Sequence, residues 1–121
     1  MNPSQPDKNL PLLLVIGNPE ENWYDLCKDY ADKFTVEQAT FEEISLSSYS
    51  DKKGAIISLA PSKRANCPRQ KVARFGLTPS LVLIRMLSRY IGGHLGSTPD
   101  YRNILYGLYH SNTPIINGYE A

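Results

Sequence analysis

The stretch LPLLLVI, residues 10–16, is a continuous apolar run that stops at the turn sequence GNP, residues 17–19. A strand with one face in water alternates apolar and polar residues. A run without a polar position instead fits a strand that is covered on both faces, as in the middle of a parallel sheet. The run therefore predicts a central strand of an α/β domain.

The rest of the chain alternates strand-like and helix-like segments. Short β-rich segments favour strands at residues 34–40, 54–60, 80–85 and 114–117. Apolar residues at helical spacing favour amphipathic helices over residues 20–34 and 99–110. Residues 41–50 are expected to form a weak helix or a loop, and residues 54–75 a β-hairpin. The pattern predicts a three-layer α/β domain with a mainly parallel sheet and flanking helices.

Length and composition fit one nearly neutral domain. The chain has 121 residues, of which 41% are hydrophobic, and a formal net charge of +1, which gives no argument for nucleic acid. Residues 1–10 are expected to be a flexible tail and residues 11–121 a single domain. We expect no signal peptide and no transmembrane segment, because no apolar run is long enough. Cys27 and Cys67 lack zinc spacing, as expected of reduced thiols in the cytoplasm.

Three polar residues are expected at the ends of parallel strands: Asn18, Arg85 and Asn117. Ligands of such sheets bind beyond the carboxyl ends of the strands, so we expect these residues along one edge, facing a ligand or a second domain. Arg85 directly follows the apolar run at residues 81–84, and its planar guanidinium suits an anionic group. The alternative is that Arg85 forms a structural ion pair, for example with Asp100.

An acidic, aromatic and basic cluster begins the expected second helix: Asp100, Tyr101, Arg102 and Asn103. An N-cap contributes about 1 kcal/mol and explains Asp100, but it does not explain the other three residues. Two interpretations stay open. One is a surface that contacts another domain or a second copy, and the other is a capped helix with solvated charges.

Residue patterns of catalytic and nucleotide-binding sites are missing. The turn at residues 17–19 has one glycine where a dinucleotide-binding loop has three, and Pro19 has no N–H to donate to phosphate. No serine stands out with a positioned histidine and acid as a nucleophilic triad. His94 and His110 lack a second ligand at metal spacing. We therefore expect no catalytic residue, no metal ligand and no cofactor in this domain.

Five basic residues with no acid between them lie in and after the expected hairpin loop: Lys63, Arg64, Arg69, Lys71 and Arg74. Each basic residue near an anionic surface contributes about 1 kcal/mol, so the five suit phospholipid or actin if they share a face. The alternative interpretation is a solvated loop.

Five segments together resemble one known family: LLLVIGNP (12–19), VEQATFEEISL (36–46), LTPSLVLIRM (77–86), DYRNILYGL (100–108) and TPIIN (113–117). In this order and spacing they resemble the synapsin N-terminal domain over residues 11–118. The resemblance implies a pre-ATP-grasp, Rossmann-like fold. In synapsins this domain precedes an ATP-grasp domain that binds ATP with calcium or magnesium.

The resemblance also implies a function. Synapsins are peripheral phosphoproteins of synaptic vesicles that tether vesicles, bind actin and phospholipid, and self-associate. On this basis we expect a non-catalytic domain that packs against an ATP-grasp domain of the same chain and forms a homodimer. It would act in the cytoplasm, at the vesicle membrane, in the regulation of neurotransmitter release.

The chain departs from the family pattern at two points. The ATP-grasp domain is not within the 121 residues, and the segment APSKRANCPRQ (60–70) stands where the family has a tighter turn. A second interpretation is the acceptor-substrate domain of an ATP-grasp ligase-like enzyme, with Arg85 and Asn117 holding the acceptor. A third, a free-standing Rossmann-like or receiver-like domain, is least favoured because the strand ends at residues 15–19 and 82–85 carry no acids.

Overall fold

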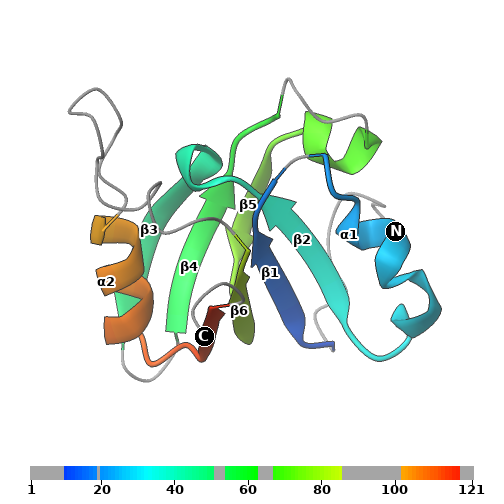
Figure 1. Ribbon diagram of the computed structural model, residues 1–121. Coiled ribbons are helices and arrows are strands. Elements are labelled where there is room, and N and C mark those ends of the chain that lie inside the picture. The colour runs from blue at the N-terminus through cyan, green and yellow to red at the C-terminus, as the bar shows by residue number, and fades with distance from the viewer. Residues whose placement is uncertain (1–9, 19, 51–53, 63–66, 86–101, 118–121) are drawn as a thin grey trace.

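The computed structural model describes residues 10–18, 20–50, 54–62, 67–85 and 102–117, which form two sheets (Figure 1). The first sheet is parallel, with the strand order β2 (Thr35–Ala39), β1 (Leu12–Ile16), β6 (Leu81–Ile84) and β7 (Ile115–Asn117). The second is antiparallel, with the order β3 (Ile44–Ser50), β4 (Gly54–Leu59) and β5 (Arg74–Leu77). The predicted α/β class with a mainly parallel sheet is confirmed, and the hairpin expected near residues 54–75 is the β4–β5 pair.

The apolar run at residues 10–16 contains β1, which lies inside the parallel sheet between β2 and β6. Leu12, Leu14 and Ile16 belong to the main core, whereas Val15 points to the other face of the sheet, and all four side chains are buried. A strand buried on both faces needs apolar residues at every position. The structure thus explains why the run has no polar residue.

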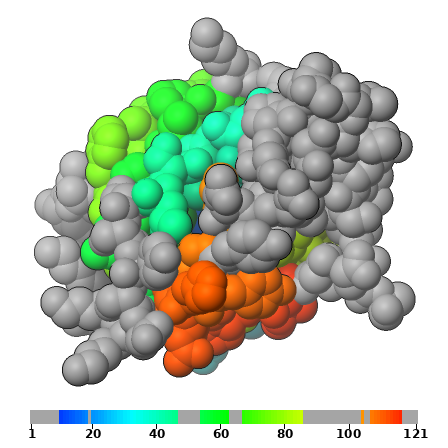
Figure 2. Space-filling view, turned by 90° about the vertical axis from the view of Figure 1, so that its left-hand side faces the viewer, coloured from blue at the N-terminus to red at the C-terminus, as the bar shows by residue number. Residues whose placement is uncertain are grey.

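The main core lies between the two sheets and helix α2 (Arg102–His110). Strand β4 contributes every second residue, Ala55, Ile57 and Leu59, and α2 contributes Leu108. Seen from the left-hand side of Figure 1, α2 lies at the surface next to the segment that begins with Phe41 and continues as β3 (Figure 2). The second sheet and α2 together therefore cover one face of the parallel sheet.

Residues 41–50 correct one sequence-based expectation, since they form mostly a strand. After a short 3-10 helix, η2 (Phe41–Glu43), the chain continues as β3. Ile44 is buried and Ser45 is exposed, which is the alternation of a strand. The serine-rich sequence disguises this pattern, and antiparallel pairing with β4 supplies the partner that makes the segment a strand.

The helix expected over residues 20–34 is much shorter than predicted. It consists of one turn, α1 (Trp23–Leu26), followed by a 3-10 turn, η1 (Lys28–Tyr30). Leu26 is 63% exposed and Tyr30 is also exposed, so the apolar stripe does not pack on the core. Short helices depend on such packing, and its absence explains why the segment does not extend as one helix.

Helices α1 and α2 lie on opposite sides of the two sheets (Figure 1).

No helix in the part of the chain that the structure describes is long and apolar enough to cross a membrane. The expected tail, residues 1–10, falls outside the described residues except for Leu10.

Candidate functional site

The carboxyl ends of the parallel strands meet at one edge of the domain, as predicted. Ile16 is in register with Ala39 and with Ile84, and Ile84 is in register with Asn117. The backbone N–H of Arg85 donates to the carbonyl oxygen of Ile16 at 2.7 Å. The positions that follow β1 and β6 and the last residue of β7 therefore lie side by side, which forms what we call the carboxyl edge.

Arg85 lies over an aromatic ring at this edge. Its guanidinium carbon is 6.0 Å from the centre of the Trp23 ring, a separation at which a cation and an aromatic face attract each other. A Cβ atom at Gly17 would lie 3.1 Å from the Cβ of Arg85, tighter than about nine in ten real Cβ contacts. A side chain at position 17 would therefore require Arg85 to shift by a few tenths of an ångström, and glycine allows the close approach without a shift.

Gln38 fixes the position of Trp23. This buried side chain accepts a hydrogen bond from the Trp23 backbone N–H at 2.9 Å. Its own amide group donates to the backbone oxygens of Asn18 at 3.0 Å and of Glu21. One glutamine of β2 thus holds the whole connection from β1 to α1, which carries the ring beneath Arg85.

Two other residues were predicted at this edge, Asn18 and Asn117, and the structure describes the side chain of Asn18 only. The side chain of Asn18 is exposed and accepts a hydrogen bond from the Glu20 backbone N–H within its own turn, at 2.9 Å. Asn117 ends β7 at the carboxyl edge, and its side chain lies outside the description. Their roles toward a ligand stay predictions.

The cluster expected at the start of the second helix lies largely outside the described residues. Arg102 and Asn103 begin α2, but their side chains are not described, and Asp100 and Tyr101 fall outside altogether. Neither an interface at this cluster nor an ion pair between Arg85 and Asp100 is therefore tested, and both stay predictions.

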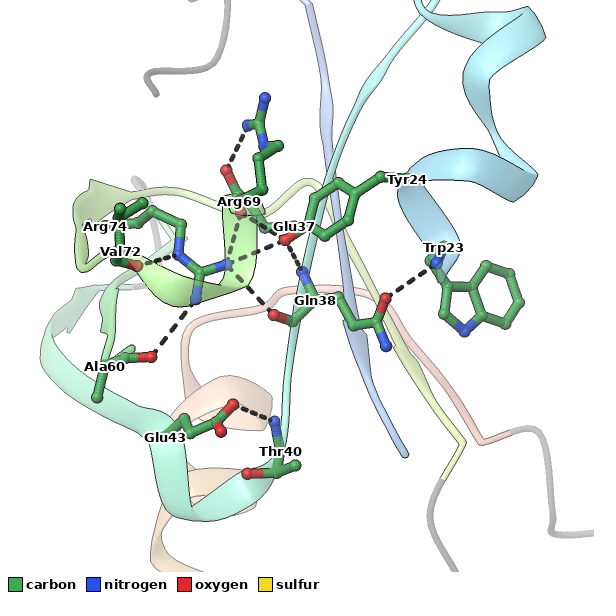
Figure 3. A network of polar contacts seen from close by, with 10 residues as sticks. All are labelled: Trp23, Tyr24, Glu37, Gln38, Thr40, Glu43, Ala60, Arg69, Val72 and Arg74. Atoms are coloured by element: carbon green, nitrogen blue, oxygen red, sulfur yellow. Dashed lines mark hydrogen bonds and ion pairs between the residues drawn. The ribbon is translucent and has the colours of Figure 1, made fainter. Parts of the chain in front are cut away.

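A buried ionic cluster joins the two sheets (Figure 3). The Glu37 carboxylate of β2 accepts hydrogen bonds from Arg74 of β5 at 3.0 Å and from Arg69 at 2.7 Å. Arg69 belongs to the 3-10 turn η3 (Pro68–Lys71). The side chains of Glu37 and Arg74 are fully buried, and Arg69 is 34% exposed. Each carboxylate oxygen of Glu37 has its own arginine, which offsets the cost of burying the charge.

Tyr24 of α1 completes the cluster. Its hydroxyl donates to Glu37 at 3.1 Å and accepts hydrogen bonds from the Gln38 N–H and from Arg74, both at 3.0 Å. Burial, followed by the negative charge of Glu37, raises the pKa of Tyr24 well above its ordinary value. The phenol therefore stays neutral, and it connects α1 to the ionic cluster.

The ionic cluster corrects the interpretation of the basic stretch as a single basic face or a solvated loop. Arg74 is buried and donates to Glu37, and Arg69 shares the same carboxylate. Burial alone would lower the pKa of Arg69, but the hydrogen bond and charge of Glu37 outweigh it and raise that pKa. Lys71 is exposed, and Lys63 and Arg64 lie outside the described residues. Two of the five charges thus hold the fold together.

The described residues do not fit the ATP and divalent cation that the resemblance implies for a neighbouring domain. Within the described ranges, no group of three or more His, Cys, Asp or Glu side chains could hold a metal ion. The turn after β1 offers one glycine, and Arg85 packs closely against it. An ATP site would need residues other than these.

Comparison with protein families identifies this fold. The model of the synapsin pre-ATP-grasp domain matches residues 6–115. The chain belongs to the synapsin family. A search among curated proteins finds no match. The matched range takes in both sheets, except the last residues of β7, and both helices, so these elements form the pre-ATP-grasp domain, which is the non-catalytic part of a synapsin.

The sequence-based prediction missed the ionic cluster. Glu37 is the one acid inside the strand segment at residues 34–40, and an acid within a strand of a largely buried sheet needs a cationic partner. That signal was present in the sequence. Its partner Arg74 lies 37 residues away and could not be chosen among the five basic residues.

Replacing Tyr24 with phenylalanine should lower the free energy of unfolding by about 1–3 kcal/mol, since Gln38 N–H and Arg74 lose an acceptor. The raised pKa adds a pH signature. Above the unfolded-state pKa of about 10, only the unfolded chain releases the Tyr24 proton, so wild-type stability falls there. Y24F should lose less stability than the wild type over that range in urea titrations. The exposed Tyr30 is the control, and a Y30F variant with the same loss would contradict the assignment.

Proposed function

We propose that this domain packs against an ATP-binding ATP-grasp domain and forms one wall of the cleft between the two. The family match over residues 6–115 carries the proposal. The carboxyl edge supports it, because ligands of parallel sheets bind beyond the strand ends, and Arg85 lies there over Trp23. In this proposal the domain contributes one wall of the cleft and the positive charge of Arg85, and the residues that bind the nucleotide belong to the other domain.

The same proposal places the protein at the cytoplasmic surface of synaptic vesicles, where it takes part in the regulation of neurotransmitter release. Membership of the synapsin family supports this role. Homodimerisation would use the segment of Asp100, Tyr101, Arg102 and Asn103, and vesicle phospholipid and actin would be further partners. Sedimentation at several concentrations tests the dimer, since a chain that stays monomeric at high concentration would contradict it.

Isothermal titration of the 121-residue chain with Mg-ATP tests whether nucleotide binding lies outside this domain. We expect no saturable heat, because the described residues offer neither a phosphate loop nor a cluster of metal-binding acids. Saturable binding in the micromolar range by this chain alone would overturn the proposal that nucleotide binding lies in another domain.

Arg85 is the residue through which the carboxyl edge would act. In a chain that carries both domains, R85A should weaken ATP binding about tenfold, the effect of losing one charge-assisted contact. In the 121-residue chain it should cost only about 0.5–1 kcal/mol of stability, from the lost contact with Trp23. K71A, which removes an exposed charge from η3, is the control. ATP affinity equal to that of the wild type would show that Arg85 does not face the cleft.

A second candidate is the acceptor-substrate domain of a ligase-like enzyme. The pairing of Arg85 with the Trp23 ring favours it, since a cation beside an aromatic face suits a small organic anion. Assays of ATP turnover by a chain with both domains, with carboxylate acceptors, test this function. Binding of ATP without turnover for any acceptor would contradict it.

A further inference from the structure

An open groove lies beside β2, away from the carboxyl edge. It has a volume of about 250 Å³ and lies between the turn that follows α1 and the amino-terminal half of β2. Its apolar surface comes from Phe34, Val36 and the Tyr24 ring, with Cys27 beside them, and its rim carries Lys28 and Arg69. None of the residues proposed for the interdomain cleft lines it.

The ionic cluster behind the groove carries a surplus of positive charge. Two arginines share the single carboxylate of Glu37, and both of its oxygens are occupied. Tyr24 does not offset the surplus, because its hydroxyl is protonated and donates to Glu37. Arg74 is buried, so the surplus is accessible at Arg69, which is partly exposed and lies 5.3 Å over the Tyr24 ring. A ligand with one negative charge would neutralise this cluster.

The groove also contains one residue of β2, Val36, whose backbone N–H and C=O have no pairing partner in the part of the chain that the structure describes. Thr35 N–H donates to Pro11 and Ala39 C=O accepts from Gly17, so residues 35, 37 and 39 direct their backbone groups toward β1. Val36 and Gln38 direct theirs to the opposite, outer edge of β2.

Val36 and Gln38 both direct their backbone N–H and C=O to the outer edge of β2, but these groups differ in their partners. Gln38 N–H donates to the Tyr24 hydroxyl, and its C=O accepts from Arg74. Among the described residues no strand or side chain pairs with the N–H and C=O of Val36, which lines the groove. With respect to the described residues, one backbone donor and one acceptor are therefore available beside an apolar surface and the positive charge of Arg69.

The size of the groove limits the ligand. Pockets for drug-sized molecules and cofactors measure about 300–1,000 Å³, and this groove is smaller. Its volume suits one side chain or two short ones. A single available rung likewise suits a short extended segment that pairs at one residue and not a full added strand.

We propose that this groove binds a short extended peptide that carries a glutamate or aspartate. The peptide backbone pairs with Val36, the acidic side chain meets Arg69 and Lys28, and a neighbouring apolar side chain packs on Phe34 and the Tyr24 ring. Lys28 can turn toward the ligand, since its Nζ lies 3.6 Å from the carboxylate of Asp25 and both side chains are largely exposed. The partner is thus an acidic protein segment.

Two peptides that differ in one charge test this proposal on the full 121-residue chain: N-acetyl-Val-Glu-Val-amide and N-acetyl-Val-Gln-Val-amide. In ¹⁵N-labelled protein we expect the glutamate peptide to shift the Val36 amide signal. The glutamine peptide should bind at least about tenfold more weakly.

The cysteines supply a second readout with an internal control. Cys27 lines the groove, whereas Cys67 does not line it and is also half-buried. Burial raises the pKa of the Cys27 thiol, so labelling with N-ethylmaleimide is run at mildly alkaline pH. The glutamate peptide should slow the labelling of Cys27 and leave that of Cys67 unchanged.

Three variants separate the site from the fold. R69M should weaken the glutamate peptide about tenfold, and K71M, the matched exposed charge on η3, should leave it unchanged. Because R69M also removes a partner of Glu37, Ala31→Trp is the independent test: it fills the groove from an exposed position and should abolish binding without loss of stability.

Three results would overturn the proposal. The first is equal binding of the two peptides, since the charge would then have no role. The second is no shift of Val36 and no protection of Cys27 at millimolar peptide. The third is binding of inorganic phosphate without binding of the glutamate peptide, which would make the groove a plain anion site.

Discussion

Replacing Arg74 with methionine should lower the free energy of unfolding by about 3–5 kcal/mol. The substitution keeps a long apolar side chain at a buried position but leaves the Glu37 carboxylate without its fully buried partner. It also removes the donor that reaches the backbone oxygens of Val72, Gln38 and Ala60. Urea unfolding followed by the fluorescence of Trp23, the single tryptophan, measures the change.

A double variant distinguishes a lost ion pair from a packing defect. In E37Q/R74M the buried charge is gone together with its partner, so the loss should be smaller than that of R74M alone. K71M removes a nearby exposed charge and should change stability by less than about 0.5 kcal/mol. If R74M were within 1 kcal/mol of the wild type, the ionic cluster would contribute little to holding the two sheets together.

Two features of the fold could be predicted from the sequence. The apolar run of β1 predicts its own burial, because every position must be apolar when both faces are covered. The alignment of Gly17 and Arg85 follows from parallel strands ending at one edge. Both inferences rest on local patterns and on general rules of sheet geometry.

Other parts of the structure depend on contacts between distant segments. Residues 44–50 form a strand through pairing with β4, although serine is common there. The helix expected from residue 20 stops after one turn, because Leu26 finds no core to pack against. The pairing of Glu37 with Arg74 likewise depends on the fold, since both residue types usually lie at the surface.

The groove beside β2 likewise could not be predicted from the sequence. Its components are the outward backbone groups of Val36, the shared carboxylate of Glu37 and the partly exposed Arg69, and they come from two distant segments of the chain, β2 and η3. None of the three is a motif in the sequence. By contrast, the candidates at the carboxyl edge could be chosen from the sequence because each follows or ends an apolar strand.

Replacing Leu108 with alanine should lower the free energy of unfolding by about 2–5 kcal/mol. Leu108 is fully buried and, among the described side chains of α2, it lies in the core between the sheets, with the partly buried Ile104 packed against that core. The cavity left by three missing carbons would adjoin β3 and β4, the strands that α2 packs against. Because α2 also begins with Arg102 and Asn103, the proposed dimer surface depends on this anchor.

The neighbouring Tyr109 provides a strict control for L108A. It is larger than leucine, but it is 62% exposed and points away from the core, so Y109A should cost less than about 0.5–1 kcal/mol. If burial and not side-chain size determines the stability of α2, the smaller side chain must cause the larger loss. Equal losses in urea unfolding would show that α2 is not anchored through Leu108. In that case a dimer surface at its first turn would need support from the residues that precede the helix.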